Sequence, residues 1–273
     1  MSTAAEGKAQ LRKAARTAGD SKLLEIPARV GFAASGLIQL LLGGLAIQLG
    51  AAHVGEADQT GALGEVTKIP GGFIVLWIAA IGLFALALWL LTEAVLVRAG
   101  STADRWIARA EHVSKAVAYA VLGFTAIAFA DGHPTHASTT TRQVSAGILA
   151  SPGGQLGLGV LGLVTGAVGC YFVVKGIRRR FRRDIEVPGG VAGHGIVVLG
   201  MVGYIAKGVV VALAGVAFIL AAVRAQPATA TGLAGGLTAL QELPFGGAAI
   251  VVLGLGLIAS GVYNIARAWL ARF

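Results

Sequence analysis

Long apolar stretches alternate with short polar segments along this chain of 273 residues. Six stretches are apolar over roughly 20 residues or more, at about 28–50, 73–97, 110–130, 155–177, 200–223 and 247–270. A helix of ~20 residues crosses the ~30 Å hydrocarbon core of a bilayer. The pattern therefore predicts an all-α integral membrane protein with six transmembrane helices.

The same pattern occurs three times along the chain. When the sequence is aligned with itself at offsets of 80 and 172 residues, residues 31–36 match 203–208. The other matching sets are Gly43, Gly123 and Gly215; Gly82, Gly162 and Gly254; and Ser35, Lys115 and Lys207. Related turns that begin at Pro70, Pro152 and Pro244 precede the second helix of each unit. Each unit is a helix, a loop, a Pro/Gly turn and a returning helix. We divide the chain into a polar tail, 1–25, and three two-helix repeats, 26–98, 99–183 and 184–273.

The repeats also predict how the helices are arranged. Because each unit crosses twice, all three share one orientation and are related by an axis along the membrane normal. A pseudo-threefold ring of three helical hairpins is the simplest closed arrangement, and an open row of hairpins is the alternative. Pairs such as Gly162 with Gly169 and Gly254 with Gly261 predict close helix packing. Gly82 is followed seven residues later by Trp89 instead, so we expect the first repeat to pack differently or to use that ring as a wedge between helices.

Composition supports the membrane assignment. The chain is 56% hydrophobic and 13% charged, whereas soluble domains average about 25% charged residues. The mean hydropathy is +0.78. These values exclude an ordinary soluble enzyme, a disordered chain and, with Cys170 as the single cysteine, a disulfide scaffold.

The basic residues predict the orientation. Of the 22 Lys and Arg, only Lys68, Arg142 and Arg224 lie in the connecting segments 51–72, 131–154 and 224–246. The positive-inside rule places these segments outside and both termini in the cytoplasm. Abundant Ala, Gly, Val and Leu, with more Arg than Lys, are typical of GC-rich genomes, so we expect a bacterial cytoplasmic (inner) membrane. The net charge of +9 then reflects topology, and no nucleic-acid partner is predicted.

Lys115 and Lys207 are the first candidate site residues. They occupy the same repeat position, within about two turns of the cytoplasmic ends of their helices. One interpretation is that both side chains extend to the lipid headgroups as anchors. The other is a basic ring at the cytoplasmic mouth of a central cavity, suited to anionic lipid headgroups or small anions. The shared position predicts that both point toward the axis or both away from it.

Other polar residues lie at membrane depth, where they usually face protein or water. Glu93 is a carboxylate within an apolar stretch, and we expect it to pair with Lys115, Lys175 or Lys207, or to bind a proton or cation. Asn264 and Arg267, near the end of the sixth stretch, are predicted on the same inner side. Gln39 and Gln48 are predicted to form hydrogen bonds between helices.

The remaining motifs predict neither a cofactor nor a catalytic centre. His133 and His136 have a metal-like spacing but no third ligand nearby, so no metal is predicted. The run from Gly157 to Gly162 matches GxGxxG, yet it lies in a membrane helix with no preceding strand, which excludes a dinucleotide site. No catalytic triad or paired carboxylates are evident, so we expect no enzymatic activity.

The Gly-aromatic-Ala-Ala run at 31–34, its counterpart at 203–208 and the three two-helix units resemble the bacterial membrane family known as domain of unknown function 1206. This family typically has a basic residue after the run; Lys115 and Lys207 keep that character, whereas the first repeat has Ser35. The resemblance implies six helices and no established activity.

Two functions are compatible with the sequence. The first is a protein that binds or conducts a small solute, ion or lipid, with Lys115 and Lys207 at its inner mouth. The second is an accessory or scaffold subunit that packs its glycine-lined faces against a larger membrane protein complex. Anionic membrane lipids are the other expected partners, through the basic tail and the run Arg178–Arg183. The oligomeric state and the substrate are not predicted.

Overall fold

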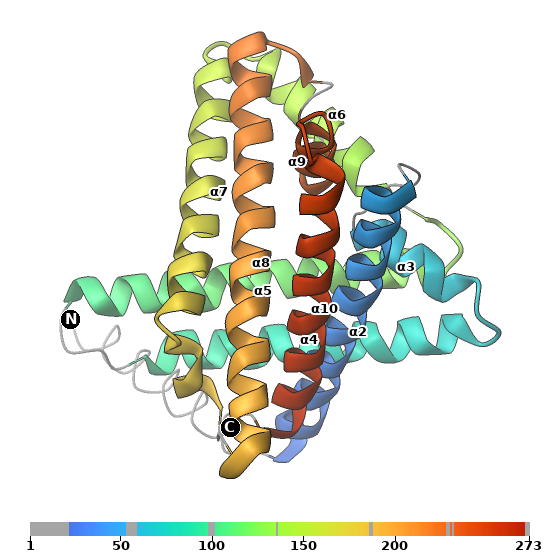
Figure 1. Cartoon of the computed structure of the whole chain (residues 1–273), viewed down its shortest axis with the longest axis vertical. Coiled ribbons are helices and arrows are strands. Elements are labelled where there is room, and N and C mark those ends of the chain that lie inside the picture. Colours follow the sequence, from blue (N-terminus) through green and yellow to red (C-terminus); the bar gives the residue numbers. More distant parts are fainter. Residues whose placement is uncertain are drawn as a thin grey trace, which may run out of the picture.

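The computed structural model describes residues 22–52, 59–97, 102–134, 136–185, 188–227, 230 and 232–270 (Figure 1). Within this part of the chain, six helices are long and apolar enough to cross a membrane. They are α2 (Lys22–Ala52), α4 (Gly72–Leu96), α5 (Thr102–Ala130), α7 (Gly154–Ile177), α8 (Gly190–Arg224) and α10 (Gly246–Leu270). The predicted class, an all-α membrane protein with six spanning helices, is confirmed. Most of the predicted tail lies outside the described residues.

Three of these helices begin well before their apolar stretches: α2, α8 and also α5, which begins at Thr102 and not at about 110. Helix α2 begins at Lys22, because Leu23, Leu24 and Ile26 extend the helical apolar pattern ahead of Pro27. Helix α8 begins at Gly190 and has 35 residues. That corresponds to roughly 52 Å, well beyond the ~30 Å hydrocarbon core. The first turns of α8 therefore extend beyond the hydrocarbon, which explains why their lower hydropathy did not mark them as helix.

Each connecting segment that was expected to be a loop contains a short helix. These are α3 (Gln59–Thr67), α6 (Ala137–Leu149) and α9 (Leu233–Gln241). The backbone amide of Ala137 donates to Thr60 Oγ1, which joins α6 to α3. Few apolar positions in such short segments leave little helical periodicity, which is why the sequence predicted only loops.

A turn of the same geometry leads from each short helix into the next long helix. Gly71, Gly153 and Phe245 all have positive φ, at 80°, 76° and 64°. The next residue is glycine in every case, and a methyl group on it would collide with a backbone carbonyl oxygen of the short helix. The contacts would be Gly72 with Val66, Gly154 with Ile148 and Gly246 with Leu240, all at or below 2.0 Å. The repeated Pro/Gly motif thus forms the same tight turn in all three repeats.

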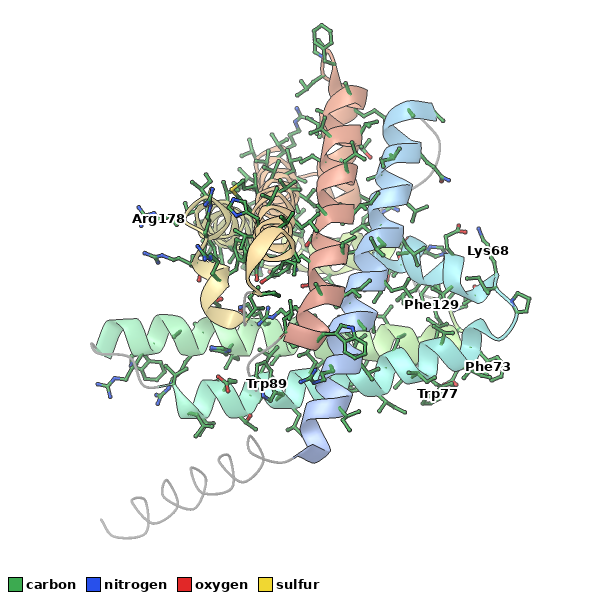
Figure 2. All side chains as sticks on the ribbon, turned by 60° about the horizontal axis from the view of Figure 1, so that its bottom comes forward. Lys68, Phe73, Trp77, Trp89, Phe129 and Arg178 are labelled. Atoms are coloured by element: carbon green, nitrogen blue, oxygen red, sulfur yellow. The ribbon has the colours of Figure 1, made fainter. Side chains whose placement is uncertain are left out.

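The long helices pack chiefly across repeat boundaries. The three most extensive helix–helix contacts are α10 with α2, α7 with α8 and α4 with α5. In each pair, the second helix of one repeat meets the first helix of the next repeat. The packing is therefore cyclic, as the pseudo-threefold prediction requires, but its unit is the inter-repeat pair and not the hairpin. Figures 1 and 2 show that the three pairs point in different directions, with α4 and α5 running across α2 and α10.

Two of these interfaces are built from equivalent glycines. A methyl group on Gly43 of α2 would lie 2.7 Å from the carbonyl oxygen of Gly254 on α10. The counterpart contact joins Gly215 of α8 to the carbonyl oxygen of Gly162 on α7, at 2.8 Å. Such close contacts let helix backbones approach, so the predicted role of the repeated glycines is confirmed.

The α4–α5 interface differs from the other two. Gly123 of α5 meets the ring of Phe84, while Gly82 packs on Gly31 of α2. Trp89 of α4 is buried and lies edge-on to Phe32, with ring centroids 6.1 Å apart (Figure 2). The first repeat does pack differently, as the sequence predicted.

An apolar cluster fills the interior between α2, α4, α5, α8 and α10. It includes Ile38, Leu42, Leu76, Leu83, Phe129, Val210 and Leu257, with Leu63 and Leu237 from the short helices. In a membrane such side chains stabilise the bundle through van der Waals packing, because lipid tails are as apolar as they are. The cluster fills the half of the bundle nearest the short helices, and polar groups lie in the other half.

Candidate functional site

A basic pocket lies at the end of the bundle opposite the short helices. Its lining comes from α2, α4, α5, α7, α8 and α10: Phe32, Leu90, Lys115, Tyr119, Phe172, Tyr204, Lys207, Ser260, Asn264 and Arg267. Three cationic side chains therefore face one small space. The pocket has a volume of about 40 Å³, room for a few water molecules.

Glu111 of α5 is the carboxylate that organises one wall. Its Oε1 atom accepts hydrogen bonds from Lys115 Nζ at 2.5 Å and from Lys175 Nζ at 2.7 Å. The Tyr171 hydroxyl donates to Oε2 at 2.5 Å. Lys115 lies one turn further along α5, whereas Lys175 and Tyr171 lie on α7. These bonds join α5 to α7, two helices that otherwise have little backbone contact.

The other two cations are held by aromatic rings. Lys207 Nζ lies 5.7 Å from the ring centroid of Phe172, and the Arg267 guanidinium carbon lies 4.5 Å from that of Phe32. The electron-rich face of an aromatic ring attracts a cation without cancelling its charge. Within the part of the chain that the structure describes, no carboxylate forms an ion pair with Lys207. The pocket therefore keeps an electropositive character.

Polar and aromatic groups complete the lining. The Asn264 side-chain amide donates to Gln39 Oε1 at 3.1 Å, in a buried bond between α10 and α2. Ser260 lies one turn before Asn264 and is also buried. Tyr204 stacks on Phe181, with ring centroids 5.3 Å apart. Val210 and Leu257, each one turn from a pocket residue, already belong to the apolar cluster, which closes the pocket toward the short helices.

The structure brings most of the predicted site residues together. Lys115, Lys207, Asn264 and Arg267 line the same pocket, so the two lysines at the shared repeat position point the same way. Lys175 joins them through Glu111.

Lys115 and Lys175 both bind Glu111, a carboxylate that the sequence did not single out, and the pairing of Glu93 stays a prediction. Glu93 is half-buried on α4, and it is absent from the described lining of the pocket. The prediction for Gln39 is confirmed by its bond to Asn264. Gln48 is exposed, so its predicted interhelical role is not found among the described residues.

Sequence reasoning missed Glu111, Tyr171 and the aromatic rings. Glu111 precedes Lys115 by four residues, a spacing that places the two side chains on one helix face. Tyr171 precedes Lys175 by the same spacing. Glu111 also falls at the repeat position of Gly31 and Gly203, so a carboxylate replaces a glycine there. That substitution was visible in the alignment of the repeats.

His133 and His136 form no metal site in the described structure. His133 and His136 are both exposed, and His136 precedes helix α6. Among the residues described, no group of three His, Cys, Asp or Glu side chains is placed to hold a metal ion.

Six membrane-length helices, arranged as three repeats around a basic pocket, define a multi-pass all-α membrane protein. The chain belongs to the family described as "Domain of Unknown Function (DUF1206)", whose model matches residues 30–96, 110–179 and 202–271. The second and third matches begin 80 and 172 residues after the first, which confirms the predicted offsets.

The chain is also similar to a bacterial protein. The chain is 28% identical over 251 residues to "Uncharacterized protein YxxB" of Bacillus subtilis (strain 168), and the match covers 88% of each chain. The name of that relative states no activity. No solved structure matches the chain. A functional proposal therefore has to come from the chemistry of the site.

Proposed function

We propose that this membrane protein binds a small inorganic or carboxylate anion in the basic pocket, without enzymatic activity. The observation that carries the proposal is the environment of Lys207. Its ammonium group faces the same space as Lys115 and Arg267, and it is held by the ring of Phe172 and not by a carboxylate. A partly buried cation at membrane depth that no carboxylate neutralises favours an anionic ligand.

The size of the pocket limits the ligand. A volume of about 40 Å³ fits a halide, nitrate or formate in place of the few waters it otherwise admits. It excludes a sugar, a nucleotide or a phospholipid headgroup. The amide of Asn264 and the hydroxyl of Ser260 add neutral polar groups to the cationic ones. Passage across the membrane would require the apolar cluster beyond Val210 and Leu257 to open.

Calorimetric titration of the purified protein with chloride, nitrate and formate tests the proposal. We expect saturable binding that Lys207→Gln weakens by at least about tenfold, because a hydrogen bond to a charged group contributes about 1.5–3 kcal/mol. Lys68→Gln is the matched control, since Lys68 is exposed on the far side of the bundle and pairs with Glu65. Equal affinity in the wild type and Lys207→Gln would contradict the proposal.

Transport needs a separate test. If the pocket is the inner mouth of a conduit, Lys115→Leu combined with Lys207→Leu abolishes anion flux in proteoliposomes while the protein still inserts. Unchanged flux in this double variant would contradict a conduit through this pocket and leave anion binding as its function.

We also propose that the pocket faces the cytoplasm of a bacterium, with the protein in the inner membrane. The support is the distribution of charge. The exposed side chains of Arg105, Arg178, Arg180 and Arg182 lie at the ends of helices near the pocket, whereas Arg142 and Lys68 lie on the short helices or their turns. The positive-inside rule then orients the molecule.

The alternative function is an accessory subunit of a larger membrane complex. It was predicted to use the glycine-lined faces, but Gly43, Gly162, Gly215 and Gly254 are already occupied within the chain. The surfaces left for a partner are those of α5 and α7, the least buried spans. Lipid tails contact apolar surfaces of the same kind, so the exposure of α5 and α7 does not favour a protein partner. A protein retained stoichiometrically in mild detergent would support the alternative.

A further inference from the structure

A second basic pocket lies beyond the end of α7, where the chain turns into α8. The short 3₁₀ helix η1 (Arg180–Asp184) forms one side of it. Phe181 anchors this helix: it is fully buried, stacks on Tyr204 and lies edge-on to Tyr263 at 5.4 Å. Ile185 is buried as well. These anchors hold the neighbouring arginines in place on the rim of the bundle.

The pocket is larger and more open to its surroundings than the central one. Its volume is about 250 Å³, and its lining includes Arg179, Arg182 and His194, with Gly190 and Gly193 from the first turn of α8. No carboxylate is among the described lining residues. Neither guanidinium group forms an ion pair within the described part of the chain. The pocket therefore offers two planar guanidinium groups with free hydrogen-bond donors.

The position of the pocket relative to the membrane indicates an amphiphilic ligand. Gly176, near the end of α7, packs against Met201 and Ile205 of α8, so residues 190–200 of α8 extend past α7. Met201 and Val198 also line the pocket, and Val198 is 46% exposed. The last turn of α7, which leads into η1, adds exposed apolar side chains, with Ile177 at 61% and Val174 at 43% exposure. A charged headgroup in the pocket would leave its hydrocarbon tail against this surface.

We propose that this pocket binds the phosphate group of an anionic phospholipid. Arginine forms paired hydrogen bonds to phosphate oxygens through its planar guanidinium group. Basic pockets between helices on the cytoplasmic side of a membrane suit anionic headgroups. The backbone amides at the start of α8 add further donors. This site is separate from the central pocket, and its occupant does not depend on the function proposed there.

Two double variants with the same change in charge test the assignment. Arg179→Gln with Arg182→Gln removes both pocket guanidinium groups. Arg178→Gln with Arg180→Gln removes two exposed arginines that do not line the pocket; Arg178 lies on the outer side of the bundle (Figure 2). Native mass spectrometry of the detergent-purified protein measures binding of phosphatidylglycerol and phosphatidylcholine. Glycerol phosphate and inorganic phosphate serve as soluble competitors.

We expect the pocket variant to lose at least about tenfold in phosphatidylglycerol affinity, since each charged hydrogen bond is worth about that factor. The rim variant should change by less than about twofold, and phosphatidylcholine should bind weakly to all three proteins. Equal losses in the two double variants would overturn the proposal in favour of diffuse surface attraction. Efficient displacement by inorganic phosphate or glycerol phosphate would overturn the lipid assignment and identify a soluble phosphate ligand.

Arg179→Gly separates ligand binding from folding. Arg179 has a φ of 51°, a conformation that glycine adopts without strain. We therefore expect this variant to melt at or above the wild-type temperature while its affinity for phosphatidylglycerol falls about tenfold. Retained lipid affinity in a stable Arg179→Gly protein would show that Arg179 does not bind the phosphate group and would overturn the proposed site.

Discussion

Glu111 joins helix α5 to helix α7 beside the basic pocket. One carboxylate accepts hydrogen bonds from Lys115, Lys175 and Tyr171. The exposed fractions of the Lys175 and Glu111 side chains are 6% and 21%, so water does little to replace these bonds. Removing one partner of such a pair leaves uncompensated charge in a poorly solvated place.

Replacing Glu111 should therefore destabilise the protein strongly. We expect Glu111→Gln to cost about 3 kcal/mol and to lower the melting temperature by several degrees in a detergent thermal-unfolding assay. Glu65→Gln is the matched control, because Glu65 and Lys68 are 41% and 69% exposed and such pairs contribute about 0–1 kcal/mol. Similar melting temperatures for the two variants would show that Glu111 has no special structural role.

The sequence identified the basic members of the site better than its acidic member. Lys115 and Lys207 stood out because a shared repeat position forces a shared direction. Glu111 sits at the edge of its apolar stretch, where a charge is expected anyway, while Glu93 lies deeper in an apolar run and drew attention for that reason. Hydropathy indicates which residues lie within the membrane, but it does not tell which helices face each other. Whether Glu93 or Glu111 binds the lysines depends on which helices face each other.

At the scale of helices, adjacent glycines on α2 have opposite roles. A methyl group on Gly43 would lie 2.7 Å from both the Gly254 carbonyl oxygen and an Ile258 side-chain carbon, whereas one on Gly44 would meet nothing within 4 Å. Gly43→Ala should cost about 1–3 kcal/mol through forced separation of α2 and α10. Gly44→Ala should be neutral or stabilising by up to about 1 kcal/mol through helix propensity. Thermal unfolding of the two variants measures the difference, and equal effects would contradict the interface.

The long helices were predictable from the sequence, and the short ones were not. An apolar run of membrane length has one stable outcome in lipid, since a helix satisfies all of its own backbone hydrogen bonds. α3, α6 and α9 depend on tertiary contacts, such as the bond from Ala137 of α6 to Thr60 of α3 and that from Gln241 of α9 to the Leu49 carbonyl of α2. The start of α8 before residue 200 was missed because its hydropathy is lower, and because the packing of Val197 with Phe181 and Tyr263 is a tertiary contact.

Across the whole molecule, the threefold pattern is broken in the second repeat. Gly31 allows α2 to approach Gly82 of α4, and Gly203 allows α8 to approach Ser260 of α10. Glu111 occupies the same repeat position on α5, and α5 does not pack closely on α7. The carboxylate and its bonds replace a glycine contact there. The departure from symmetry thus creates one wall of the basic pocket.

The orientation of the whole molecule can be tested with single cysteines. Cys170 is the only native cysteine, so a Cys170→Ser background needs one change. In that background we expect Ser151→Cys to react with an impermeant maleimide added to intact cells or spheroplasts. Arg180→Cys should react only after permeabilisation, because basic segments stay on the cytoplasmic side. The reverse labelling pattern would invert the topology and place the pocket outside.

The central claim, that the basic pocket is an anion site, is tested most directly by locating a bound anion. Bromide has anomalous X-ray scattering that reveals its position in a crystal of the wild-type protein. The account predicts a bromide peak between the Lys207 ammonium and the Arg267 guanidinium groups, lost in crystals of Lys207→Gln. A pocket without bromide, at a concentration that occupies surface sites elsewhere on the same molecule, would contradict the account.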